Sequence, residues 1–220
     1  MNQILTIYFF NKKQNSNLIL LAFLSLLLIL LRVKITHDIY LLFLLWNLIL
    51  AYLPYMLSSK IKSTMPGTFT FYFFLFGWLL FIPNSFYLIT DFVHLHHSNS
   101  LQFLFDAVIL TCFTVAGFYA GIASLLQIHT LGEMKFSRKK CSYLIIILCY
   151  LISFGIYLGR ILRFNSWDIL SNPVNLLDNI FKSLLRFEAY VFTIVMGTLI
   201  LLIYGFIYGI LNKKIILKSW

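Results

Sequence analysis

Four polar residues near the middle of the chain have the spacing of a single helical face. In the stretch PNSFYLITDFVHL, which ends a long apolar run, they lie at i, i+3, i+7 and i+10: Asn84, Tyr87, Asp91 and His94. A carboxylate three residues before a histidine can serve with it as an acid–base pair. Asp91 and His94 are therefore the candidate catalytic residues, and Asn84 and Tyr87 are candidate ligand contacts. Pro83 has no backbone N–H, so a kink or a restart of the helix is expected just before them.

Two later segments are expected to bring polar residues to the same end of the molecule. Asp106 lies near the start of the next apolar run, and GRILRFNSWD supplies Arg160 and Arg163, three residues apart. Planar guanidinium groups hold phosphates and carboxylates through paired hydrogen bonds. The remaining candidate ligand-binding residues come from the same segment: Asn165, Trp167 and Asp168. Together these residues predict an anionic ligand, for which a lipid phosphate at headgroup level is suitable.

Several uses of this polar cluster stay open. The cluster would bind an anionic or lipid-linked ligand or a membrane partner, or it would belong to an envelope enzyme that acts on a lipid phosphate. A divalent metal would have Asp91, His94 and Asp106 as its ligands, since an Asp-x-x-His pair can point at one ion. A small transporter or transporter subunit is a further alternative. In a purely structural alternative, Asp106 pairs with Arg160 or Arg163 and only pins two helices together.

The composition of the chain is that of a membrane protein. Hydrophobic residues make up 61% of the 220 residues and charged residues only 11%, against about 25% in soluble domains. Six apolar runs are close to the roughly 20 residues that cross a bilayer, and lipid requires them to be helical. They cover residues 18–35, 39–57, 69–90, 103–128, 142–160 and 189–211. The predicted fold is an all-α, polytopic bundle of about six transmembrane helices, forming one membrane domain over residues 1–220.

The distribution of basic residues predicts that both termini face the cytoplasm. Six spans put both termini on one side, and eleven of the Lys and Arg residues flank the spans there, against six on the other side. The more basic side of a membrane protein faces the cytoplasm. The net charge of +10 thus reflects orientation in the bilayer, and nucleic acid is not expected as a partner. The polar cluster then lies at the extracytoplasmic end.

Small residues and one amphipathic stretch complete the pattern. Glycine pairs four residues apart predict close helix packing, within the chain or with a second copy. These pairs are Gly117/Gly121, Gly155/Gly159 and Gly205/Gly209. Residues 161–188 contain no clear span, and an amphipathic helix at the membrane surface is expected near 176–187.

Four stretches carry a recognisable combination of residues. They are WNLILAYLP at 46–54, GWLLFIPNSFYLITDFVHL at 77–95, FDAVILTCFTVAGFYAGIASL at 105–125 and GIYLGRILRFNSWDILSNP at 155–173. Together they resemble the bacterial integral membrane proteins catalogued as domain of unknown function 1361. The resemblance implies a multi-pass protein of the bacterial cytoplasmic membrane, and it implies no reaction or cofactor. Its pattern touches Trp46, Asn47, Pro83, Asn84, Tyr87, Thr90, Asp91, His94, Asp106, Arg160, Arg163, Asn165, Trp167 and Asp168.

Overall fold

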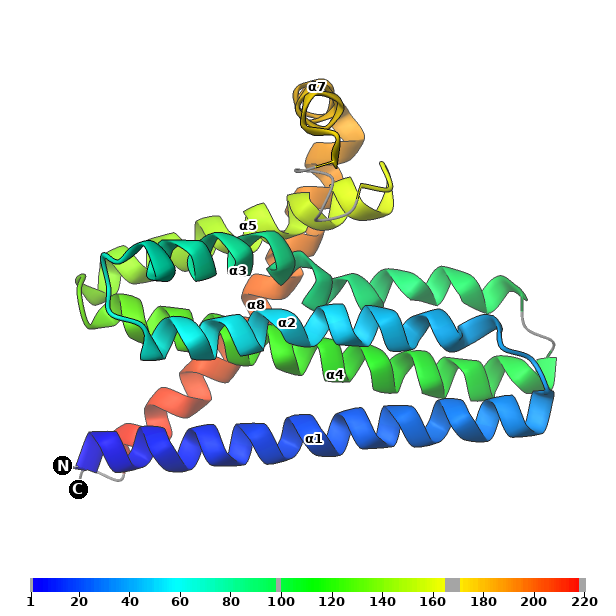
Figure 1. Ribbon diagram of the computed structural model, residues 1–220, viewed down its shortest axis with the longest axis horizontal. Helices are drawn as coiled ribbons and strands as arrows, with labels where there is room; N and C mark the ends of the chain where they lie inside the picture. The colour runs from blue at the N-terminus through cyan, green and yellow to red at the C-terminus, as the bar shows by residue number, and fades with distance from the viewer. Residues whose placement is uncertain (1, 98–99, 165–170, 218–220) are drawn as a thin grey trace. The chain divides into compact units, whose positions relative to one another are not determined.

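The computed structural model describes residues 2–97, 100–164 and 171–217, and the regular structure in these ranges is helical throughout (Figure 1). The elements are α1 (Asn2–Thr36), η1 (Tyr40–Leu42), α2 (Phe43–Ser63), α3 (Phe69–Tyr87), η2 (Leu88–His97), α4 (Ser100–Glu133), α5 (Arg138–Arg160), α7 (Pro173–Ser183) and α8 (Phe187–Leu217). The two elements labelled η are 3-10 helices.

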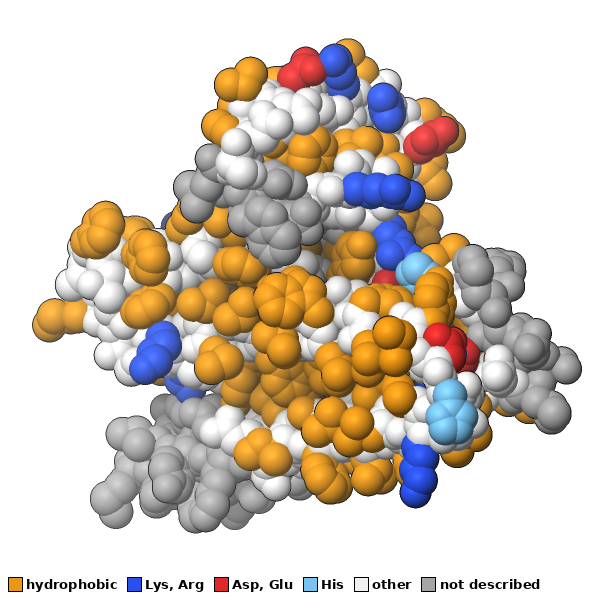
Figure 2. All heavy atoms as spheres, turned by 45° about the vertical axis from the view of Figure 1, so that its right-hand side comes forward, with side chains coloured by type: hydrophobic (Ala, Val, Ile, Leu, Met, Phe, Trp, Pro, Cys, Tyr) orange, Lys and Arg blue, Asp and Glu red, His pale blue; other side chains and the backbone are white. Residues whose placement is uncertain are grey.

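Within the described ranges, six helical segments are long and apolar enough to cross a membrane. They are Gln14–Thr36, Tyr40–Ser63, Phe69–Leu95, Gln102–Glu133, Arg138–Arg160 and Phe187–Leu211. Each contains most of one apolar run predicted from the sequence, so the prediction of an all-α membrane bundle is confirmed. Many large apolar side chains of these segments are exposed, and hydrophobic side chains gather across the middle of the face in Figure 2. In a lipid bilayer, exposed apolar surface of this kind is favourable.

The chain folds as two compact units, unit 1 (Met1–Ser124) and unit 2 (Leu125–Trp220). The division falls within α4. The prediction of one domain over residues 1–220 stays a prediction.

Unit 1 has an apolar core to which α1, α2, η2 and α4 contribute. Ile29, Leu44 and Phe113 are buried completely within it. Helices α2 and α3 pack closely, and a chain of hydrogen bonds joins them to α4. The Trp78 indole N–H donates to Ser124 Oγ at 2.6 Å, and Ser124 Oγ donates to the Pro54 carbonyl at 3.0 Å. Buried polar groups are thus satisfied between helices, as the membrane interior requires.

The first glycine pair lies where α4 passes very close to α3 and η2. A Cβ atom built on Gly117 would lie 2.7 Å from the backbone oxygen of Ser85, and one on Gly121 would lie 2.6 Å from the Phe86 ring. Only glycine fits such an approach without a shift of the neighbours. The prediction of close packing is confirmed for this pair.

The pair on α8 behaves differently. No atom lies within 4 Å of a Cβ built on Gly205 or Gly209, so the prediction that this pair packs closely is wrong for the single chain. The same spacing occurs in both pairs, but only the pair on α4 faces another helix. Unit 2 instead uses Gly197 of α8, where an added Cβ would overlap the Tyr150 ring of α5.

The kink expected at Pro83 stays a prediction, whereas helix α3 does not restart there. It continues to Tyr87, and the backbone passes into the 3-10 helix η2 at Leu88. Proline removes one hydrogen bond from the ladder, but helices in a membrane bundle tolerate it because neighbouring groups satisfy the freed carbonyl. The change of helix type therefore lies between Asn84 and Asp91.

Candidate functional site

The 3-10 helix η2 brings the two candidate catalytic residues onto one face. A 3-10 helix has three residues per turn, so side chains at i and i+3 lie directly above one another. Asp91 and His94 have this spacing in η2. Asp91 has no exposed surface, and its Oδ2 accepts a hydrogen bond from the Asn47 amide of α2 at 3.0 Å. The carboxylate is therefore held against α2.

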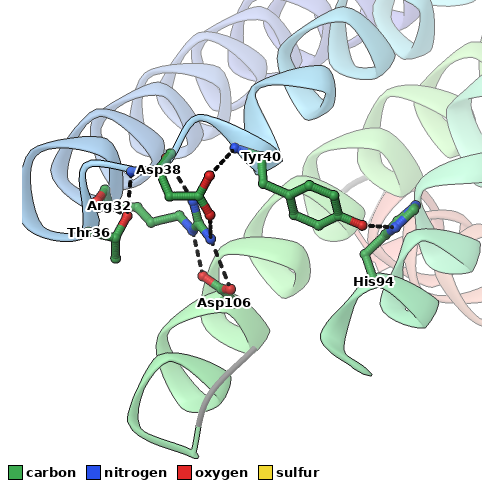
Figure 3. Close-up of polar contacts among 6 residues, drawn as sticks. All are labelled: Arg32, Thr36, Asp38, Tyr40, His94 and Asp106. Carbon is green, nitrogen blue, oxygen red and sulfur yellow. Dashed lines mark hydrogen bonds and ion pairs between the residues drawn. The ribbon is translucent and has the colours of Figure 1, made fainter. Parts of the chain in front are cut away.

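His94 is only half-buried, and the start of the second membrane segment positions its ring. Its Nδ1 hydrogen-bonds with the Tyr40 hydroxyl at 2.8 Å (Figure 3). The Phe43 ring lies edge-on to the imidazole, with 4.9 Å between the ring centroids. Hydrogen bonding at one ring nitrogen favours one tautomer and one ring orientation. His94 is thus a partly accessible titratable group held in a defined position.

Asp106 belongs to a buried ion pair whose cation is Arg32. Arg32 Nε donates to Asp106 Oδ1 at 2.7 Å, and its Nη2 lies 3.3 Å from Oδ2. Each of the two side chains is only 3% exposed. Arg32, at the end of α1, is thus one cation beside Asp106, and the pairing of Asp106 with Arg160 or Arg163 stays a prediction. The pair joins α1 to α4, so Asp106 has a structural use.

The turn after α1 is folded around the same arginine. Arg32 Nη1 donates to the Asp38 carbonyl at 2.9 Å, and Nη2 lies 3.2 Å from Asp38 Oδ2 (Figure 3). His37 has a positive φ of 54°, and its N–H donates to the Val33 carbonyl. This left-handed residue ends α1 and reverses the chain, as it does at many helix C-termini. The reversal brings Asp38 back to Arg32.

Asp38 is more exposed than Asp106 and contributes less to the pairing. Its Oδ1 accepts the Tyr40 backbone N–H at 2.9 Å, which together with Arg32 lowers the pKa of the Asp38 carboxyl. The side chain is 52% exposed, so water screens its attraction to Arg32. The buried Asp106 is therefore the principal partner of Arg32.

Asn84 and Tyr87 lie in the last turn of α3, directly before η2, and both are half-buried. The backbone there is supported from two sides. Thr90 Oγ1 donates to the Tyr87 carbonyl at 2.6 Å, and Thr114 Oγ1 of α4 donates to the Leu88 carbonyl at 3.1 Å. The predicted face is therefore divided between an α-helix and a 3-10 helix.

The three candidate metal ligands do not form a ligand set. Within the described ranges there is no group of three or more His, Cys, Asp and Glu side chains placed to hold a metal ion. Asp91 and His94 share a face of η2, whereas Asp106 pairs with Arg32 from α4.

The two candidate arginines belong to unit 2. Arg160 is the last residue of α5, and Arg163 follows it, exposed and with a positive φ of 60°. The Phe164 N–H donates back to the Leu158 carbonyl, which fixes the turn around Arg163. A non-glycine residue in this conformation is uncommon and often marks a functional position. The other candidates of this segment lie outside the described residues: Asn165, Trp167 and Asp168.

Sequence reasoning missed the residues that hold the unit 1 candidates. In the sequence, Arg32 is one of the basic residues that flank a span, and no pattern singles out Tyr40. Asn47 appeared only as part of the family pattern. The available signal was the presence of an arginine and an amide at the ends of apolar runs, where ionisable and amide groups need partners.

A second polar cluster, in unit 2, was also missed. His129 Nδ1 hydrogen-bonds with the Tyr204 hydroxyl, and the Tyr208 hydroxyl donates to Glu133 Oε1 at 2.8 Å. Arg138 Nε lies 3.5 Å from the same carboxylate oxygen. The cluster links α4 to α5 and α8. His129 and Glu133 are four residues apart, as are Tyr204 and Tyr208, but the two pairs and Arg138 become neighbours only through the fold.

Comparison with known proteins identifies the family but no activity. A family model described as "Protein of unknown function (DUF1361)" matches residues 46–203. No curated protein and no solved structure matches the chain. The matched range contains α2, α3, η2, α5 and α7 nearly or wholly in full, together with every residue of the four stretches that carry the resemblance. With more than half of its length matched, the chain belongs to the DUF1361 family.

Proposed function

We propose that this multi-pass membrane protein binds an anionic, phosphate-bearing lipid or lipid-linked ligand at the extracytoplasmic end of its helices, without turnover. The observation that supports the proposal best is Asp91, a carboxylate with no exposed surface inside a candidate membrane span. A carboxylate at membrane depth costs stability, and such residues in spans generally mark ligand or ion sites.

The ligand-binding residues fall into two groups, which belong to different units. In unit 2, Arg160 and Arg163 bind the phosphate through paired, charge-assisted hydrogen bonds. Asn165, Trp167 and Asp168 follow them in sequence and supply further contacts. In unit 1, a separate group of candidate contacts, suited to hydroxyl or amine groups, consists of Asp91, His94, Asn84 and Tyr87. Asp106 also pairs with Arg32, and its oxygens can accept further hydrogen bonds, so it stays a candidate contact.

Replacing both arginines by lysine (Arg160→Lys, Arg163→Lys) is expected to weaken lipid binding by about tenfold or more, although the charge is unchanged. Lysine cannot form the paired planar contacts, and a hydrogen bond to a charged group contributes about 1.5–3 kcal/mol. In the measurement, phosphatidylglycerol is titrated into phosphatidylcholine nanodiscs that hold the full chain, and the rise in the Tm of the chain is recorded. A ligand that binds the folded state raises Tm in proportion to its affinity.

The matched control is Lys139→Arg with Lys140→Arg, two exposed residues at the opposite end of α5. It is expected to bind the lipid as the unaltered chain does. Full affinity in the arginine-to-lysine variant would show that the phosphate is not held at these arginines. A change in the mass of the added lipid would instead favour the envelope-enzyme alternative, with Asp91 and His94 as acid and base.

A further inference from the structure

Helix α7 has three distinct faces, whereas a helix on the surface of a soluble protein needs only two. The first face carries Leu176 and Ile180, which are half-buried, and Ser183, which is buried. Residues at i, i+4 and i+7 share one side of a helix. This face is the least exposed side of α7.

The second face is polar and internally paired. The Lys182 ammonium lies 2.5 Å from Asp178 Oδ2, and the Asn179 amide donates to the Asn175 backbone and side-chain oxygens at 2.9 Å. Pairs of this kind, four residues apart, are typical of a helix surface in contact with water.

The third face is an exposed apolar stripe. Val174, Leu177 and Phe181 are 78%, 54% and 66% exposed, and they follow one another at i, i+3 and i+7. Leu185, directly after the helix, continues the stripe and is 88% exposed. Large apolar side chains that form one helix face favour an apolar environment, because exposing contiguous apolar surface to water is unfavourable.

The connections of α7 bring it to the membrane surface. Only residues 184–186 separate it from α8, which crosses the membrane, and backbone hydrogen bonds from Leu185 to Lys182 and from Arg186 to Ser183 keep this link tight. With 11 residues, α7 is roughly 16 Å long, about half of a bilayer core. A helix too short to span, attached directly to the entrance of a span, lies at headgroup level.

We infer that α7 is an interfacial helix whose stripe of Val174, Leu177, Phe181 and Leu185 inserts into the lipid leaflet beside α8. Its occupant is the bilayer itself, because lipid already surrounds the span to which α7 is joined. The polar face with Asp178 and Lys182 then points to water. An amphipathic helix in this position has its apolar side at the boundary between headgroups and acyl chains.

Nitroxide scanning of the full chain in nanodiscs tests the inference. Single cysteines are introduced as Val174→Cys, Leu177→Cys and Phe181→Cys on the stripe and as Asn175→Cys, Asp178→Cys and Asn179→Cys on the polar face. The background variant has Cys112, Cys141 and Cys149 replaced by alanine, and its Tm and monodisperse elution are compared with those of the unaltered chain. Leu176→Cys and Ile180→Cys serve as matched controls on the packed face.

The measured quantity is the collision rate of each nitroxide label with two reagents. Oxygen partitions into lipid, and a nickel chelate stays in water. The stripe labels are expected to collide more with oxygen, the polar labels more with nickel, and the packed-face labels little with either. Equal nickel access at all six positions would overturn the inference, because α7 would then lie in water. Stripe labels shielded from both reagents would also overturn it, because another protein surface would then cover the stripe.

Discussion

Removing either partner of the Arg32–Asp106 ion pair is expected to lower the free energy of unfolding by about 3–5 kcal/mol. Arg32→Met leaves the Asp106 carboxylate buried without Arg32, and Asp106→Leu leaves the guanidinium with the half-exposed Asp38 as its remaining anion in this turn. Both side chains are 3% exposed, so water cannot replace the missing partner. Chemical unfolding of the purified chain in a fixed detergent gives the comparison.

The double variant Arg32→Met/Asp106→Leu is the control for this prediction. Exchanging a whole buried ion pair for apolar side chains is often close to neutral, so most of the lost stability is expected to return. Asp38 also loses contacts to Arg32 in this variant, but its carboxylate is half exposed and remains hydrated. A double variant that loses the sum of both single effects would mean that the two residues do not act as a pair.

Adding a methyl group where α4 closely approaches α3 and η2 is expected to lower the free energy of unfolding by about 1–3 kcal/mol. In Gly117→Ala the new Cβ would lie 2.7 Å from the Ser85 backbone oxygen and 2.6 Å from Leu88 Cδ1. The leucine tip can turn away, but the backbone oxygen moves only if α3 moves. Chemical unfolding of the purified chain in the same detergent measures the loss of stability.

Gly205→Ala and Gly209→Ala make the same chemical change on a membrane helix where the added Cβ meets no atom within 4 Å. They are expected to be neutral or to stabilise the chain by up to about 1 kcal/mol, because alanine favours a helix more than glycine does. If Gly117→Ala were tolerated as well as Gly205→Ala, the tight packing of α4 against α3 would be wrong.

The six spans could be predicted from sequence because lipid imposes one simple rule on length and polarity. The shared face of Asp91 and His94 was also predictable, since residues three apart are neighbours in an α-helix and in a 3-10 helix alike. The ion pair between Asp106 and Arg32 could not be predicted in this way. Its cation, Arg32, lies 74 residues earlier, and the choice among the cations depends on which helix packs beside α4.

The same limit applies to the other contacts of the site. Asn47 is 44 residues from Asp91, and Tyr40 is 54 residues from His94. Spacing within one segment cannot reveal either contact, because both arise when η2 packs against η1 and α2. The glycine pairs show the limit most clearly, since identical spacing is a tight contact on α4 and open surface on α8.

Native mass spectrometry of the unaltered chain tests ligand binding most directly. The chain is released from nanodiscs that contain equal amounts of phosphatidylglycerol and phosphatidylcholine, at a salt concentration that screens the exposed lysines. The expected result is retention of phosphatidylglycerol in clear excess over phosphatidylcholine, with the excess lost in Arg160→Lys/Arg163→Lys. Equal retention of the two lipids, or retention of neither, would contradict selective binding of an anionic lipid by this chain.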